Sequence, residues 1–169
     1  YGRNEIKLAK EYWTDAINLD NKNTKFLYSR AYASIKLNQY NEAIEDFTSF
    51  IEKDTNNIEA YFNRGIAYFN IDEYQNAIND WKIVTEKKDD HLKAYINLGI
   101  AYFKLRNFEE SINMFNKAIE IKNDYPEAYY KKGVVLYYIN KRNKACSEWK
   151  KANELGHEGA ASKLQEYCK

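Results

Sequence analysis

The sequence contains two adjacent stretches of equal length, IEAYFNRGIAYFNIDEYQNAINDWKIVTEKKDDH at residues 58–91 and LKAYINLGIAYFKLRNFEESINMFNKAIEIKNDY at residues 92–125. The two stretches match without a gap, and the same 34-residue spacing continues in both directions along the chain. A repeat of this length holds two helices and is typical of a stacked array. Such an array has no single active-site pocket by construction, so its function is sought on a long exposed face.

Three series of residues keep this spacing, one of them bulky and two of them small. They are Trp13, Phe47, Trp81, Phe115 and Trp149; Ala31, Gly65, Gly99 and Gly133; and Ala9, Ala43, Ala77, Ser111 and Ala145. The pattern predicts that a small residue of the first helix in each unit makes room for a large ring of the second. We therefore expect a bulky residue at Gly99 to cost about 1–3 kcal/mol of stability, and Trp81→Ala about 3–5 kcal/mol.

Turn and cap signals divide the units into helices. Asn38, Asp72 and Asn140 follow the first helices, and these residue types tolerate the left-handed conformation of a helix end, whereas Arg106 is the exception in that series. Pro126 is the only proline and fits the first turn of a helix. The sequence therefore predicts pairs of helices joined by short turns.

The large and small residues of these units closely resemble the signature of the tetratricopeptide repeat family. The pattern is carried by Tyr61, Gly65, Tyr68, Tyr74, Ala77 and Trp81, and by Tyr95, Gly99, Tyr102, Phe108, Ser111 and Phe115. The resemblance covers nearly the whole chain and implies an all-α fold, a right-handed superhelical α-solenoid of antiparallel helix pairs with a C-terminal capping helix. The tail is similar to that of bacterial tetratricopeptide and Sel1-like proteins, and the Asn-, Lys-, Ile- and Tyr-rich composition also favours a bacterial source.

The repeat pattern predicts a single solenoid domain over residues 1–169. Its parts are the second helix of a truncated repeat at 1–23, full repeats at 24–57, 58–91, 92–125 and 126–157, and a capping helix at 158–169. The chain starts at Tyr1 partway through a repeat, so we expect it to be a fragment or a processed product.

One side of the first helices is a candidate binding face. In the family this side lines a concave groove, and here it mixes aromatic and aliphatic residues with amides and lysines, which suits an extended peptide or a partner helix. The candidate peptide-binding residues are Tyr28, Tyr32, Phe62, Asn63, Ile66, Lys93, Ile96, Asn97, Ile100, Tyr130, Lys131 and Tyr138. The alternative interpretation is that the apolar members form the core between neighbouring first helices.

The sequence does not match the residue pattern of one more specific binding mode. Some members of the family hold the C-terminal carboxylate of chaperones with lysines and asparagines in successive units, and Asn63 and Lys93 match that pattern. Tyr28, Tyr32 and Asn97 stand where other types are required. A carboxylate-clamp co-chaperone is therefore not predicted.

Composition argues against other partner classes. Of 169 residues, 44% are hydrophobic and 30% charged, which is enough apolar material for a core. The 26 basic and 25 acidic side chains give a net charge of +1, so the chain lacks the basic field that nucleic acid or an anionic membrane attracts. No stretch approaches the roughly 20 apolar residues of a membrane-spanning helix. We expect a protein or peptide partner, no nucleic acid and no membrane insertion, with a homo-oligomer left open.

The two cysteines leave two alternatives. Cys146 and Cys168 flank a turn near Gly156 at similar distances, so they face each other if the last two helices form an antiparallel hairpin. They then form either a disulfide, which implies a periplasmic or exported protein, or a pair of packed thiols in a cytoplasmic one.

Signals for catalysis are absent or weak. His157 and Glu158 are not followed by the second histidine of a zinc hydrolase helix, and there is no phosphate-binding glycine loop or nucleophile elbow. We predict a non-enzyme with no catalytic residue, no cofactor and no metal. The first hypothesis is a scaffold that binds a peptide or partner helix in the groove; the alternatives are a structural spacer or self-stacking module, and a substrate-recruiting fragment of a multidomain enzyme.

Overall fold

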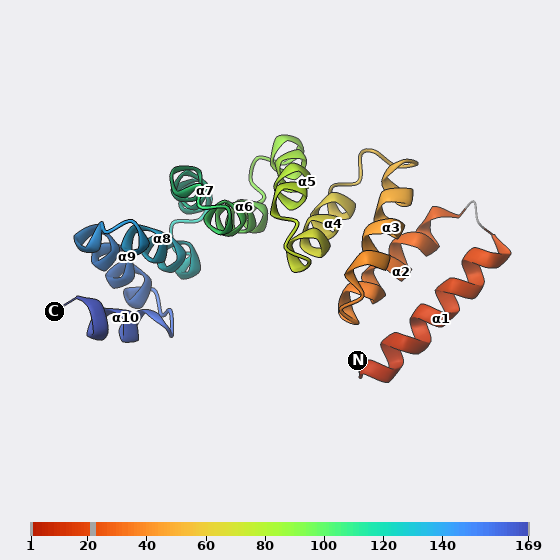
Figure 1. The fold of residues 1–169 in the computed structure, drawn as a ribbon, viewed down its shortest axis with the longest axis horizontal. Coiled ribbons are helices and arrows are strands. Elements are labelled where there is room, and N and C mark those ends of the chain that lie inside the picture. The colour runs from red at the N-terminus through yellow and green to blue at the C-terminus, as the bar shows by residue number, and fades with distance from the viewer. Residues whose placement is uncertain (1, 21–22, 169) are drawn as a thin grey trace. The chain divides into compact units, whose positions relative to one another are not determined.

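The computed structural model describes residues 2–20 and 23–168, and within them the chain forms ten α-helices and no strand (Figure 1). The helices are α1 (Arg3–Leu19), α2 (Thr24–Lys36), α3 (Tyr40–Ile51), α4 (Ile58–Asn70), α5 (Tyr74–Lys87), α6 (Leu92–Lys104), α7 (Phe108–Ile121), α8 (Pro126–Tyr138), α9 (Arg142–Glu154) and α10 (Ala160–Tyr167). The predicted segments 1–23 and 158–169 each include residues outside this description, namely 1, 21, 22 and 169. The all-α prediction is confirmed.

Local sequence signals explain where the helices begin and end. The side chain of Asn57 accepts a hydrogen bond from the Ala60 amide at 3.0 Å and so caps α4, and Pro126 stands in the first turn of α8. All four turns inside the helix pairs contain a residue with left-handed backbone, at Asn38, Asp72, Arg106 and Asn140, with φ between 60° and 62°. The first helices consequently start 34 residues apart, where the repeat pattern predicts them.

The chain divides into two compact units, Tyr1–Lys88 and Asp89–Lys169, called here the N-terminal and C-terminal units. In the N-terminal unit α1 packs on α2, α2 pairs with α3, α3 contacts α4, and α4 pairs with α5. In the C-terminal unit α6 pairs with α7, α7 contacts α8, α8 pairs with α9, and α10 packs on α9. Sequence neighbours are spatial neighbours, as an α-solenoid of antiparallel helix pairs requires. The superhelical sense and the division into repeat domains stay predictions.

Each complete pair is centred on a small residue beneath an aromatic ring. A Cβ atom added to Gly65 would lie 2.5 Å from Trp81 Nε1, and one added to Gly99 would lie 2.6 Å from the Phe115 ring. Trp81 is only 1% exposed, and its indole donates a hydrogen bond to the Phe62 carbonyl at 3.1 Å. The predicted packing of small against large residues is therefore confirmed.

A disulfide fixes the C-terminal end. Cys146 on α9 and Cys168 at the end of α10 are bonded, with their Cα atoms 5.7 Å apart. Of the two alternatives that the sequence leaves open, the structure has the disulfide. The bond holds α10 against α9, where Tyr167 packs on Trp149 with ring centroids 6.0 Å apart.

We predict that Gly65→Ala lowers the free energy of unfolding by about 1–3 kcal/mol, because its methyl group would overlap the Trp81 indole. The matched control is Gly65→Ala combined with Trp81→Phe, which recreates the Ala31 and Phe47 pair of the preceding repeat. In the Trp81→Phe background the alanine should cost much less. Urea unfolding followed by circular dichroism measures both, and equal costs in the two backgrounds would contradict the packing.

We also predict that Arg106→Asn raises stability by about 0.5–1 kcal/mol, because asparagine tolerates left-handed backbone better than arginine. The reciprocal change, Asn140→Arg, should lower stability by a similar amount. Thermal unfolding of the two variants checks the sign, and a loss of stability in Arg106→Asn would argue against conformational strain at this turn.

Candidate peptide-binding face

The first helix of each pair turns one side toward its second helix and leaves the opposite side available. In α4 the side toward α5 contains Gly65, which lies beneath Trp81, while Asn70 on the other side is exposed. We call the available side of α2, α4, α6 and α8 the first-helix face.

In the N-terminal unit the structure divides the five predicted residues between surface and core. Tyr32 is 45% exposed, and Tyr28 and Ile66 are half-buried. Phe62 and Asn63 are buried, and the Asn63 amide donates a hydrogen bond to the Tyr28 hydroxyl at 3.2 Å. Phe62 and Asn63 are therefore packed beneath this face and offer little exposed surface to a partner.

Tyr28 stands at the centre of an aromatic cluster on this unit. Its ring meets Phe47 and Phe50 edge-on, at centroid distances of 5.5 and 5.3 Å. Burial raises the pKa of the Tyr28 phenol, and the nearby carboxylate of Glu59 raises it further. The hydroxyl consequently stays protonated at neutral pH and can act as a hydrogen-bond donor.

A pocket of about 700 Å³ lies beside Tyr28 and Tyr32. Its other wall is α1, which contributes Ile6, Ala9 and Trp13. The pocket is mainly apolar, with Glu5, Ser29 and Lys36 as its polar and charged residues. The binding face predicted from the sequence does not include α1.

In the C-terminal unit seven predicted residues occupy three environments. Ile96 is buried in the core with Phe115 and Val135, whereas Lys93 is exposed and Asn97 is half-buried. Tyr138 is 50% exposed, and its ring packs edge-on against Phe103 at 5.4 Å. The remaining three, Ile100, Tyr130 and Lys131, line one pocket.

This pocket has an apolar wall and a cationic rim. Its volume is about 370 Å³, and it lies between α6 and α8 with one further residue each from α7 and α10. The lining residues are Ile100, Phe103, Lys104, Phe115, Tyr130, Lys131, Val134, Val135 and Lys163. Three lysines around aliphatic and aromatic side chains suit an apolar group that has a carboxylate next to it.

Glu127 and His157 hold two of the lining residues in place. The His157 ring stacks on Tyr130 with a centroid distance of 4.0 Å, and its Nδ1 accepts a hydrogen bond from the Gly159 amide. His157 Nε2 lies 2.9 Å from Glu127, and the same carboxylate lies 3.3 Å from the Lys131 ammonium. The orientation of Tyr130 and Lys131 is thus set before any ligand is bound.

Sequence reasoning missed one contributor to this pocket entirely. Lys163 belongs to α10, which was predicted only as a cap, although this helix stands one repeat after α8 and so takes a first-helix position. Phe103, Lys104 and Val134 follow the helical spacing of the first-helix face, which is the signal that identifies them.

No group of three or more His, Cys, Asp or Glu side chains in the described part of the chain is arranged to hold a metal ion. No described helix has the length and apolar character to cross a membrane.

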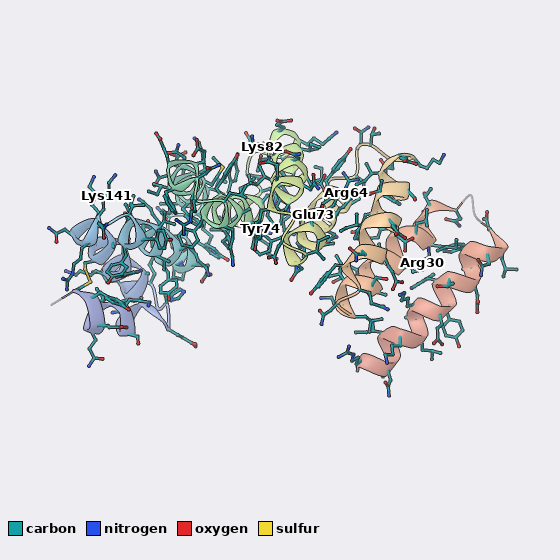
Figure 2. The ribbon with its side chains drawn as sticks, in the orientation of Figure 1. Arg30, Arg64, Glu73, Tyr74, Lys82 and Lys141 are labelled. Carbon is teal, nitrogen blue, oxygen red and sulfur yellow. A yellow bond between two sulfur atoms is a disulfide. The ribbon has the colours of Figure 1, made fainter. Side chains whose placement is uncertain are left out.

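Ion pairs between half-buried arginines and buried aspartates fix the first helices of the N-terminal unit. Arg30 reaches from α2 to Asp46 on α3, and Arg64 reaches from α4 to Asp80 on α5 in the same way, with two hydrogen bonds in each pair. Figure 2 labels the two arginines. Burial raises the pKa of the Asp80 carboxyl, and the hydrogen bonds and charge of Arg64 oppose that rise. The corresponding positions in the next repeat are Leu98 and Met114, so the pair is not required at every repeat.

Comparison with known proteins identifies related repeats. A family model described as tetratricopeptide repeat matches residues 92–125, and another described as TPR repeat matches residues 31–72. No curated protein sequence matches the chain. A crystal structure of MamA is similar over 94% of this chain and 92% of its own, with 27% identity and a TM-score of 0.87.

Two further solved structures share the fold at lower identity. MamA 41-end from Desulfovibrio magneticus RS-1 has 21% identity and a TM-score of 0.85, over 89% of this chain and 85% of its own. YrrB, described as a TPR protein with an unusual peptide-binding site, has 19% identity and a TM-score of 0.85, over 96% of this chain and 84% of its own. The fold class is therefore that of tetratricopeptide repeat solenoids.

We predict that Arg64→Leu lowers the free energy of unfolding by about 3–5 kcal/mol at neutral pH, because it leaves the Asp80 carboxylate buried without its cation. Adding Asp80→Met copies the Leu98 and Met114 pair and should restore most of that loss. In the single variant the folded-state pKa of Asp80 lies above its unfolded value. The loss should therefore shrink as the pH falls toward the ordinary value of 3.8 and grow as the pH rises. Urea unfolding at several pH values tests this, and a pH-independent loss would contradict it.

Proposed function

Because this chain belongs to the tetratricopeptide repeat family, we propose that it is a protein-interaction scaffold whose C-terminal unit binds an extended peptide segment. The observation that carries the proposal is the pocket between α6 and α8, which lies on the first-helix face and contains Ile100, Tyr130 and Lys131 of the predicted set. Its size suits one large apolar side chain. YrrB, a protein of the same fold, is described as having a peptide-binding site, which supports this use of the fold.

The charges around the pocket define the peptide it would accept. Lys104, Lys131 and Lys163 stand around apolar walls, so an aspartate, a glutamate or a terminal carboxylate next to the inserted side chain gains attraction. Glu127 already neutralises part of the Lys131 charge, which leaves Lys163 as a main source of selectivity. The proposed ligand therefore combines a bulky apolar residue with an adjacent acidic group.

We infer that the chain has no catalytic function, in keeping with an interaction module. The Cys146–Cys168 disulfide favours an oxidising compartment, and so an exported protein.

Selection of random peptides displayed on phage against the whole chain tests the proposal. We predict enrichment of peptides in which a large apolar residue is next to Asp or Glu, and roughly tenfold weaker binding of these peptides to a Lys131→Glu/Lys163→Glu variant, a loss on the order of 1.4 kcal/mol. Lys144→Glu is the matched control, because Lys144 is exposed on the second helix α9. Peptides without acidic enrichment, or equal binding by the variant and the wild type, would refute the assignment.

A further inference from the structure

Helix α10 is held against the rest of the C-terminal unit at both of its ends. At its C-terminal end the Cys146–Cys168 disulfide, drawn as a yellow bond in Figure 2, joins it to α9. Just before its N-terminal end the His157 ring stacks on Tyr130 and lies 2.9 Å from Glu127, two residues of α8. The middle of α10 therefore lies between two fixed points.

Lys163 reaches the peptide pocket from the middle of this helix. It follows the buried Ala160 by three residues, just as Lys131 follows the buried Ala128 in α8, and both lysines line the pocket. With a rise of 1.5 Å per residue, the Cα atoms of Lys163 and Cys168 lie about 7–8 Å apart along the helix. The position of the Lys163 ammonium consequently depends on how the C-terminal end of α10 is held.

The contacts at that end gather around the disulfide. The Tyr167 ring precedes Cys168 and packs on Tyr137 and Trp149, with centroid distances of 4.5 and 6.0 Å. The Tyr167 carbonyl also accepts a hydrogen bond from the Arg142 side chain. These contacts belong to the neighbour of the bonded cysteine, so the covalent link keeps them formed.

Without the disulfide, few contacts hold α10 in this chain. The helix is eight residues long, its N-terminus has no side-chain cap, and Ala160 is its one buried residue. A helix of this length has little stability of its own in water. A cross-link between residues 22 apart restricts the detached state and favours docking on the order of a hundredfold. Loss of the bond therefore shifts α10 strongly toward the detached state.

We propose that the Cys146–Cys168 pair controls the peptide pocket between α6 and α8. The disulfide form holds Lys163 at the rim and binds acidic peptides, whereas the dithiol form detaches α10 and loses much of that selectivity. This inference rests on the proposed function of the same pocket. In an oxidising compartment the pocket is complete, and a chain whose cysteines are still thiols has a weaker one.

The reduction is an ordinary thiol–disulfide exchange with a dithiol such as dithiothreitol. One thiolate of the reductant attacks a sulfur of the pair, and the other cysteine leaves as a thiolate and takes up a proton. The second thiol of the reductant then breaks the mixed disulfide and closes the reductant into a ring. Two electrons pass to the protein, which gains two thiols.

Hydrogen exchange followed by mass spectrometry tests the detachment of α10 without any peptide. On reduction of the whole chain, the amides of α10 should lose protection at least tenfold, while those of α8 and α9 keep theirs. The Cys146→Ser/Cys168→Ser variant should behave like the reduced chain with or without dithiothreitol. Unchanged protection of α10, or equal loss throughout α8, α9 and α10, would overturn the proposal.

Calorimetric titration tests the link to the pocket. The probes are an acidic peptide from the phage selection and its counterpart with asparagine or glutamine in place of the acid. The oxidised chain should prefer the acidic peptide by about tenfold, and reduction should lower this preference to about threefold or less. Lys163→Gln should lower it similarly in the oxidised chain while α10 stays protected from exchange.

The outcomes separate this inference from the proposed function. An oxidised chain that binds neither peptide would refute the peptide pocket itself and, with it, its control by the cysteines. Binding by the oxidised chain with the same preference after reduction would leave the pocket in place and overturn only the control by the disulfide.

Discussion

The structure depends on one steric constraint, the close approach of two helices that is possible only where a small residue meets a large ring. Gly65, Gly99 and Gly133 leave so little room that even one added carbon would overlap the aromatic ring above it. Dense packing of this kind fixes the relative position of the two helices. A shift along either helix would move the small residue away from the ring and bring a larger side chain into a clash with it. Repeating that contact every 34 residues then makes a solenoid.

The candidate binding face is a consequence of this packing. Once the small side of a first helix is committed to its partner, the opposite side must either pack against the next first helix or meet solvent. Phe62 and Ile96 are buried, while Ile100 and Tyr130 line a pocket. Function on this fold therefore depends on which few residues of the first-helix face remain accessible once the helices have packed together.

The repeats differ mainly where the packing does not constrain them. One pair of positions holds Arg64 and Asp80 in one repeat and Leu98 and Met114 in the next, which is understandable because a buried ion pair and an apolar pair can be similar in stability. In α1, Leu8 and Tyr12 differ from the polar residues that most later repeats have at these positions. Such departures from an internal standard are the places where a specific role is most readily recognised.

The sequence by itself determined the helices, the turns and the pairing of small with large residues, because these follow from local spacing that repeats along the chain. It also predicted Ile100, Tyr130 and Lys131 as binding residues; they line one pocket, and their binding role stays a prediction. Only the tertiary structure decided that Asn63 is buried beneath Tyr28, that Lys163 joins the pocket and that Cys146 is bonded to Cys168. Those outcomes depend on how closely side chains from different helices approach each other. The spacing of residues along one helix carries no information about that distance.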